Sequence, residues 1–164
     1  ASPAADSVPN LMALDAKVEL QSVEGSRRLV LDDFILGNRK TVKAKNELMT
    51  GLIIPRPSQN AVGAFEKLGA RKYLVISIVM AAVVVEWTED EKVKQIHVAV
   101  GACSEVACRL RKLEEDCLGI KFNEIQITTE NLEGLAPIDD IRAVADYRME
   151  VVVELIQRAI LQTC

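Results

Sequence analysis

The chain has 164 residues and a mass of 18.0 kDa, enough for one compact domain or for one domain with part of another. Hydrophobic residues make up 49% of the sequence and charged residues 27%, values that are ordinary for a soluble globular protein. The formal net charge of −4 argues against non-specific binding of nucleic acid.

The sequence carries no sign of export or membrane insertion. Residues 1–15 lack the basic start and the uninterrupted apolar centre of a signal peptide. The longest apolar run, Tyr73–Val85, is shorter than the roughly 20 residues that a membrane-spanning helix needs. The cysteines match no CxxC or zinc spacing, so we expect free thiols of a reducing compartment and predict a cytoplasmic protein. They are Cys103, Cys108, Cys117 and Cys164.

Charge is distributed unevenly along the chain. Residues 1–82 hold 11 basic and 8 acidic side chains, whereas residues 83–164 hold 9 and 16. A phosphate-bearing ligand should therefore prefer the first half, although the acidic second half also fits a set of solvated helix faces.

The first third of the sequence predicts short elements that end at a proline-rich segment. A short helix is expected after Pro9, a β-hairpin turning at Glu24-Gly25, and a helical turn before Gly37. The basic stretch Asn38–Lys45 follows. The strands predicted here are Lys17–Ser22, Arg27–Leu31 and Glu47–Ile54. Two prolines in Pro55–Ser58 stop any strand or helix, so we place a domain boundary there.

The remainder predicts an antiparallel sheet of three strands covered by helices. The strands are Ala61–Leu68, the apolar run Tyr73–Val85, and the alternating segment Val93–Gly101, whose Gln95 and His97 should face away from the core. Helices are expected over Glu105–Leu118, near Thr128–Leu135, and from about Asp139. The stripe expected to bury the last helix is Ile141, Ala145, Met149, Val152, Ile156 and Ala159.

Most self-sufficient catalytic systems are missing from the sequence. His97 is the only histidine, so a Ser–His–Asp or Cys–His nucleophile has no obvious base. Neither a phosphate-binding P-loop nor a Rossmann GxGxxG fingerprint occurs. Asp139-Asp140 could be a pair of catalytic carboxylates, but their position at a predicted helix start favours capping. From the residues alone, we expect a binding or structural domain.

Four collinear motifs change that interpretation. They are ASPAADSVPNLMALDAKVEL (Ala1–Leu20), RKTVKAKNELMTGLIIPRP (Arg39–Pro57), FEKLGARKYLVIS (Phe65–Ser77) and APIDDIRAVADYRMEVVVELIQRAI (Ala136–Ile160). Together they resemble the FAD-binding subunit of the molybdenum hydroxylases, the family of the carbon monoxide dehydrogenase medium subunit and the xanthine dehydrogenase flavin part. The resemblance implies an α+β protein in two parts. Residues 1–58 would be the tail of a FAD-binding subdomain, and residues 59–164 a C-terminal domain with a three-stranded antiparallel sheet against helices.

The resemblance also implies an oxidoreductase function. In the family, FAD accepts electrons that leave a molybdopterin centre through two [2Fe–2S] clusters, and passes them to NAD⁺ or another acceptor. The molybdopterin is bound by a large partner subunit and the clusters by a small one. The expected role of the chain is therefore electron transfer within an enzyme of several subunits, without a membrane span and without nucleic acid.

Six residues match positions that contact the cofactor in the family. Asp6 corresponds to the carboxylate that accepts hydrogen bonds from hydroxyls of FAD, Met49 to an apolar flavin contact, and Lys67 to a lysine that reaches the cofactor. Arg71, Lys72 and Tyr73 lie on the loop that approaches the isoalloxazine ring and gates the acceptor. Other interpretations stay open: Asp6 as a helix cap, the basic residues as a solvated loop, Met49 as a core residue, and Tyr73 as the first core residue of a strand.

Two departures from the family pattern shape the expectation. The family's glycine-rich pyrophosphate loops lie before the motif that begins at Ala1, so we expect a fragment or split subunit that binds FAD weakly or not at all by itself. The xanthine dehydrogenases carry acidic residues where this chain has Tyr73-Leu74-Val75, which argues against NAD⁺ as the acceptor. The alternative function is a non-catalytic scaffold domain of the same fold that has lost the flavin.

Overall fold

A computed structural model describes every residue of the chain except Leu74. The helices are α1 (Ser7–Ala13), α2 (Leu31–Phe34), α3 (Arg111–Cys117) and α4 (Ala145–Leu161). The strands are β1 (Lys17–Ser22), β2 (Gly25–Val30), β3 (Ile35–Gly37), β4 (Lys40–Thr41), β5 (Leu48–Ile53), β6 (Ala61–Leu68), β7 (Val79–Trp87), β8 (Val93–Gly101) and β9 (Cys108–Arg109). Two 3₁₀ turns, Phe122–Glu124 and Glu130–Leu132, precede α4.

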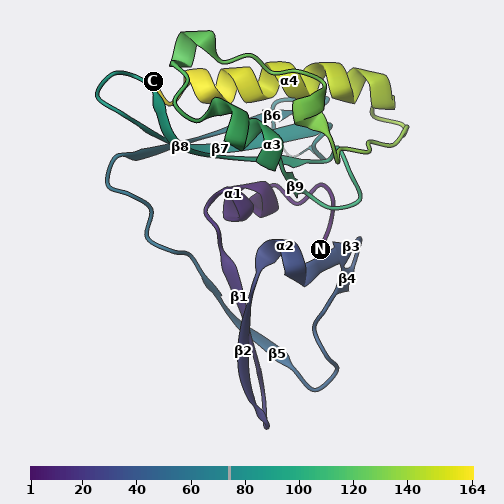
Figure 1. Cartoon of the computed structure of the whole chain (residues 1–164). Helices are drawn as coiled ribbons and strands as arrows, with labels where there is room; N and C mark the ends of the chain where they lie inside the picture. Colours follow the sequence, from purple (N-terminus) through teal and green to yellow (C-terminus); the bar gives the residue numbers. More distant parts are fainter. Residues whose placement is uncertain (74) are drawn as a thin grey trace.

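The strands form antiparallel sheets that pack against helices, which confirms the predicted α+β fold (Figure 1). One sheet has the order β2-β1-β5, and β3 pairs with β4. The largest sheet has the order β6-β7-β8-β9, so a two-residue fourth strand joins the three that the sequence predicts. Figure 1 shows α4 above this large sheet and α1 below it.

The large sheet is covered on both faces, which explains why its central strand is almost continuously apolar. Val79, Val83 and Val85 of β7 belong to a core that includes α4 residues such as Ile156. Ala82 and Ala99 face the opposite way and pack in a second core with α1. A strand that is buried on both faces loses the alternation of a half-solvated strand. The prediction that the face of β8 with Gln95 and His97 points to solvent is therefore wrong near Ala99, which is fully buried.

The central strand begins later than its composition suggests. The prediction that the buried strand starts at Tyr73 is wrong, because Tyr73 is 70% exposed and β7 begins at Val79. The reason is the register: Leu68 pairs with Val79, so residues 69–73 and 75–78 lie in the connection between β6 and β7. Leu74, part of the same predicted run, lies outside the described residues. We call residues 69–73 and 75–78 the β6–β7 loop.

The helical predictions were partly wrong for a local reason. The predicted helix Glu105–Leu118 is β9 followed by the shorter α3, and the segment near Thr128–Leu135 contains only a 3₁₀ turn. The last helix begins at Ala145 instead of Asp139, and Ile141 is almost fully exposed.

Side chains of the two aspartates delay the start of α4. Asp140 accepts hydrogen bonds from the backbone N–H groups of Arg142 and Ala143, and Asp139 accepts one from that of Ala145. Such local bonds give the backbone an alternative to the helix. Asp139 therefore binds the first N–H group of α4, whereas Asp140 binds N–H groups that precede the helix and does not cap it.

Three further observations concern cysteines, membrane spans and metal sites. All four cysteines are free thiols. Within residues 1–73 and 75–164, no helix is long and apolar enough to cross a membrane. Over the same residues, no group of histidine, cysteine and carboxylate side chains could hold a metal ion.

Candidate functional site

The side chain of Asp6 organises a polar cluster at the start of α1. Asp6 precedes the helix, yet its carboxylate makes no capping hydrogen bond within the described structure. Instead, its Oδ2 accepts a hydrogen bond from Nζ of Lys67 at 2.5 Å, and its Oδ1 accepts one from Oγ of Ser77 at 2.6 Å. The interpretation of Asp6 as a simple helix cap is therefore wrong. We call Asp6, Lys67 and Ser77 the Asp6 cluster.

The pairing of β6 with β7 brings two members of this cluster together. Lys67 lies near the end of β6, and Ser77 lies two residues before β7 begins. The backbone N–H of Ile78 donates to the carbonyl of Leu68 at 2.8 Å, which closes the β6–β7 loop at its base. Lys67 Nζ also donates to the carbonyl of Val75 at 3.0 Å, so one lysine contacts both the loop and Asp6.

The cluster is charged and accessible. Partial burial acts to raise the pKa of Asp6, but hydrogen bonds from Lys67 and Ser77 outweigh it and hold the pKa below its usual value of 3.8. The side chain of Asp6 is nevertheless 44% exposed and that of Lys67 25% exposed. A ligand can therefore reach an ionised carboxylate beside an ammonium group.

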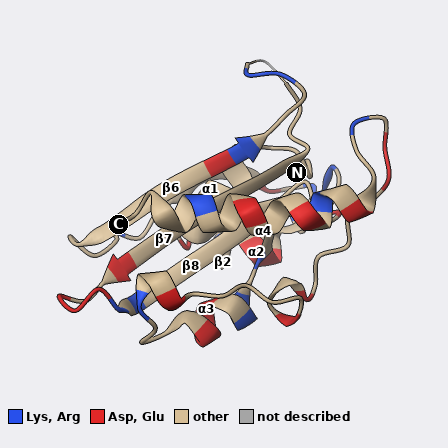
Figure 2. Ribbon diagram, turned by 90° about the horizontal axis from the view of Figure 1, so that it is seen from above, with Lys and Arg blue, Asp and Glu red and all other residues tan. Residues whose placement is uncertain are grey.

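The rest of the β6–β7 loop adds positive charge next to this cluster. Arg71, Lys72 and Tyr73 are all exposed, and Lys72 Nζ lies 5.4 Å from the centre of the Tyr73 ring. In Figure 2 the end of β6 and the loop beyond it are basic, whereas the turn after β7 is acidic. The interpretation of Tyr73 as the first core residue of a strand is wrong, since its ring is in solvent.

Met49 occupies a different part of the molecule. It lies on β5, opposite Leu20 of β1, in the smaller three-stranded sheet. Its side chain is exposed, so the interpretation of Met49 as a core residue is wrong. The structure thus joins Asp6 to Lys67 directly, places Arg71, Lys72 and Tyr73 on the adjoining loop, and leaves Met49 on another sheet.

Ser77 is the cluster member that the sequence analysis did not select. It was visible as the only polar, non-aromatic residue of the apolar run Tyr73–Val85. Its side chain is buried, with 2% of the residue exposed. A buried hydroxyl needs a hydrogen-bond partner, and Asp6 supplies it from 71 positions away in the sequence.

A buried arginine, Arg148, contacts the last residue of the β6–β7 loop. Arg148 of α4 donates to the carbonyls of Ile78 and Ala102 and forms an ion pair of 2.7 Å with Asp140. Backbone hydrogen bonding to Arg142 is the main reason why the pKa of Asp140 falls to about 2. These contacts hold the start of β7 against α4, beside a groove of about 650 Å³ whose lining includes Ile76 and Arg148.

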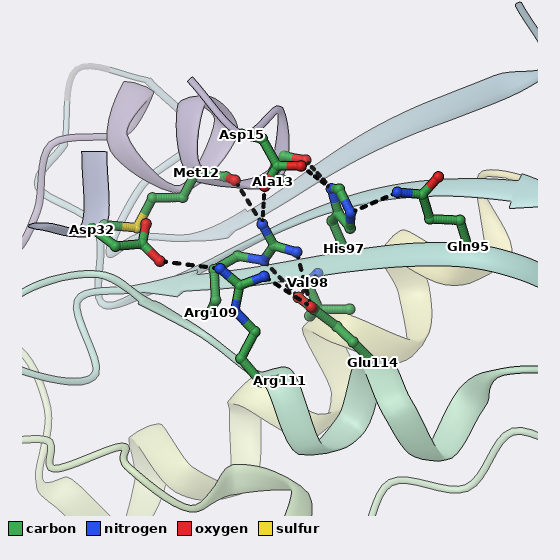
Figure 3. Close-up of polar contacts among 10 residues, drawn as sticks. All are labelled: Met12, Ala13, Asp15, Asp32, Gln95, His97, Val98, Arg109, Arg111 and Glu114. Atoms are coloured by element: carbon green, nitrogen blue, oxygen red, sulfur yellow. Dashed lines mark hydrogen bonds and ion pairs between the residues drawn. The ribbon is translucent and has the colours of Figure 1, made fainter. Parts of the chain in front are cut away.

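A second cluster joins the other end of α1 to the sheet (Figure 3). Arg109 of β9 donates through Nε and Nη2 to both carboxylate oxygens of Glu114, at 2.6 and 2.8 Å. Its Nη1 donates to the carbonyl of Met12 at 2.9 Å and to Asp15 at 2.8 Å. We call Arg109, Glu114, Asp15 and the carbonyl of Met12 the Arg109 cluster. Its arginine side chain is only 2% exposed, so it offers little to a ligand.

The lone histidine, His97, lies beside Asp15 of the Arg109 cluster. Its ring contacts groups that hold elements of the fold together. His97 Nδ1 lies 2.8 Å from the carbonyl oxygen of Ala13 and 3.4 Å from Asp15. Its Nε2 lies 3.0 Å from the side-chain amide of Gln95. A ring that contacts a backbone carbonyl on one side and an amide on the other has no nucleophile to activate.

The comparisons with known proteins cover nearly the whole chain. Residues 64–163 match the family described as the CO dehydrogenase flavoprotein C-terminal domain. Residues 1–57 match the FAD binding domain in molybdopterin dehydrogenase. Asp6 falls within the second match, and Lys67 and Ser77 fall within the first.

Two curated relatives have similar sequences. The nicotinate dehydrogenase FAD-subunit of Eubacterium barkeri is 31% identical over 140 residues, which are 84% of this chain and 46% of that relative. The nicotine 6-hydroxylase medium subunit of Paenarthrobacter nicotinovorans is 32% identical over 156 residues, which are 93% of this chain and 53% of that relative. The chain thus spans about half the length of the curated relatives it matches.

A solved structure shows the same fold. A chain of reconstituted CO dehydrogenase from Oligotropha carboxidovorans superposes with a TM-score of 0.87 at 24% identity, over 99% of this chain and 57% of that chain. The family match extends over residues 64–163, well over half of the sequence. The chain therefore belongs to the CO dehydrogenase flavoprotein C-terminal domain family, and its first 57 residues match the FAD binding domain in molybdopterin dehydrogenase.

Proposed function

We propose that the chain is part of the FAD-binding, electron-transferring subunit of a molybdopterin-dependent hydroxylase or dehydrogenase. The single observation that carries this proposal is the Asp6 cluster, in which a carboxylate that does not cap its helix meets Lys67 on an accessible surface. Asp6 and Lys67 lie in the two segments that match a FAD-binding domain and a flavoprotein domain.

The residues present suit a flavin nucleotide. An ionised carboxylate accepts hydrogen bonds from sugar-alcohol hydroxyls, and Asp6, whose pKa lies below its usual value, is ionised at neutral pH. An ammonium group at Lys67 would attract the anionic cofactor to this surface. The isoalloxazine ring of a bound FAD supplies the electron-transfer chemistry.

The basic loop would set access to the flavin. Arg71, Lys72 and Tyr73 are exposed next to the Asp6 cluster, so they suit contact with the ring and control of the acceptor. Met49 would contact the flavin from β5, where its exposed thioether leaves apolar surface to cover. The chain carries no carboxylate at positions 73–75, so an acceptor other than NAD⁺ is favoured.

The remaining assignments follow from the same proposal. Electrons would arrive from [2Fe–2S] clusters on a small partner subunit, after substrate oxidation at molybdopterin on a large one. The relatives named as medium subunits support such an assembly. We further propose a cytoplasmic location, which suits four free thiols, and a division into residues 1–58 and 59–164.

Flavin titration of the complete flavoprotein tests the proposal. Replacing Lys67 by Met, or Asp6 by Ala, removes hydrogen bonds that involve a charged group, so the Kd of FAD should rise roughly ten- to hundredfold. Flavin fluorescence quenching measures it. Lys45→Met is the matched control, because Lys45 is an exposed lysine of the basic stretch 38–45, remote from the cluster in sequence.

Two outcomes would contradict the proposal. Unchanged FAD affinity in both variants would refute the assignment of the site. Complete absence of flavin from the assembled complex, judged by its absorbance near 450 nm, would favour a scaffold domain that kept the fold without the cofactor. We expect the chain alone to bind FAD more weakly than the assembled complex.

A further inference from the structure

We propose that Ser77 is a positioning residue: its buried hydroxyl holds the Asp6 carboxylate in place and ties it to the end of the β6–β7 loop. The inference rests on the proposed function for its link to the flavin, and on the hydrogen-bond geometry for the rest. None of the sequence motifs or comparisons assigns a role to this hydroxyl.

The two oxygens of Asp6 are occupied from two sides. Ser77 donates to Oδ1 at 2.6 Å and Lys67 donates to Oδ2 at 2.5 Å. Because the donors differ, the plane of the carboxylate is fixed, and a hydroxyl of a ligand must approach the remaining lone pairs from the exposed side. A lysine alone, with a long flexible stem, fixes a carboxylate poorly.

Ser77 is better placed than Lys67 to fix this orientation. Its side chain has a single rotatable bond before the hydroxyl, and the residue is buried beside the start of β7. Its neighbour Ile78 is anchored by the backbone bond to Leu68, and the Ile78 carbonyl accepts a hydrogen bond from Arg148. The hydroxyl is thus carried by a rigid segment, which is what holds a binding group at a defined place.

The same hydrogen bond couples the loop to the cofactor site. Among the hydrogen bonds of the described residues, Ile78 to Leu68, Lys67 to Val75 and Ser77 to Asp6 lie at the end of the β6–β7 loop. The bond from Ser77 joins the loop to the start of α1, and the bond from Arg148 to the Ile78 carbonyl joins it to α4. A displacement of Asp6 would therefore move the exposed basic residues of the loop, and a displacement of the loop would move the Asp6 carboxylate.

Limited proteolysis of the chain tests this coupling without any cofactor. Trypsin cleaves after the exposed Lys72 in the loop and after the exposed Lys45 outside it, and mass spectrometry separates the two cuts. Ser77→Ala should raise the ratio of the Lys72 cut to the Lys45 cut about fivefold, since one of the ties of the loop is lost. Asp6→Ala removes the acceptor of the same hydrogen bond and should raise the cleavage ratio by a similar factor.

The double variant separates positioning from a general packing role. If Ser77 acts through Asp6, Ser77→Ala should change the cleavage ratio by less than about twofold when Asp6 is already Ala. Additive effects of the two substitutions would overturn the proposal, as would an unchanged ratio in both single variants.

The cofactor readout separates this proposal from the proposed function. In the complete flavoprotein, Ser77→Ala should raise the Kd of FAD about tenfold, with little further effect in the Asp6→Ala background. If Asp6→Ala itself leaves the Kd unchanged, the proposed function fails, while the proteolysis result still decides the coupling. If Asp6→Ala weakens FAD and Ser77→Ala does not, the positioning role is refuted.

Discussion

The two ends of α1 are held to the large sheet by clusters of similar composition and different character. At each end an aspartate meets a basic side chain from the sheet: Asp6 meets Lys67, and Asp15 meets Arg109. At the second end the arginine is buried, and its guanidinium contacts two carboxylates and a backbone carbonyl. At the first end both charged side chains remain partly in solvent.

The difference separates a structural ion pair from a candidate ligand site. Burial acts to lower the pKa of Arg109, but the Glu114 and Asp15 carboxylates more than offset it, so the pKa is raised and the cation is held tightly. Such a group contributes mainly to holding two elements together. The Asp6 cluster has accessible acceptor and donor groups instead, and accessibility is what a ligand requires.

The largest effect is expected from breaking the buried cluster. Arg109→Met keeps much of the side-chain volume and leaves Glu114 without its bidentate partner. Removal of one member of a buried ion pair typically costs about 3–5 kcal/mol, which we expect here. Urea unfolding measures it, and Arg158→Met is the control, because Arg158 forms an exposed pair with Glu154 that should contribute less than about 0.5 kcal/mol. A loss below about 1 kcal/mol for Arg109→Met would show that the buried cluster is not structural.

A smaller loss is expected from the apolar middle of α1. Met12 is 3% exposed and packs in the second core between the two clusters. Met12→Ala should destabilise the fold by about 2–4 kcal/mol, through lost burial and the cavity left behind. The same urea experiment applies, with Leu36→Ala as the exposed apolar control. An equal loss in both variants would mean that α1 does not contribute a core of its own.

The smallest effect on stability is expected at the Asp6 end. Asp6→Asn should cost less than about 1 kcal/mol at pH 7, since both side chains of the pair remain partly in solvent. The folded pKa of Asp6 is lowered, so its contribution is fully present above 3.8 and is lost as the pH falls through the lower folded value. Unfolding measured from pH 6 to pH 2 should therefore show a slightly flatter acid limb for Asp6→Asn. A steeper limb would reverse the sign that we assign.

The sequence predicted the elements better than their junctions. Hydrophobic pattern and turn residues indicated β1, β2, β5 and the three long strands, because those signals are local. The start of β7 and the start of α4 were misplaced. The first depends on which residue pairs with Leu68, and the second on two aspartate side chains that compete for backbone N–H groups.

The candidate site was predictable only in part, and for a similar reason. A family resemblance suggested Asp6 and Lys67, but composition alone would have left them as a cap and a surface charge. Ser77 and the Arg109 cluster required the fold, since their partners lie 71 and 94 positions away in the sequence. No spacing rule connects residues that only the packing of α1 on the sheet brings together.

Asp15 adds a further consequence, because it has a left-handed backbone with φ of 52°. Glycine adopts this conformation without steric cost, whereas most other residues do not. A glycine at this position would relax the turn after α1, but it would remove the Asp15 carboxylate from Arg109 and from His97. At Asp15, the backbone conformation therefore favours glycine, whereas the ion pairs favour aspartate. A search for thermostable variants guided by backbone preference alone would choose Asp15→Gly and would weaken the attachment of α1 to the sheet.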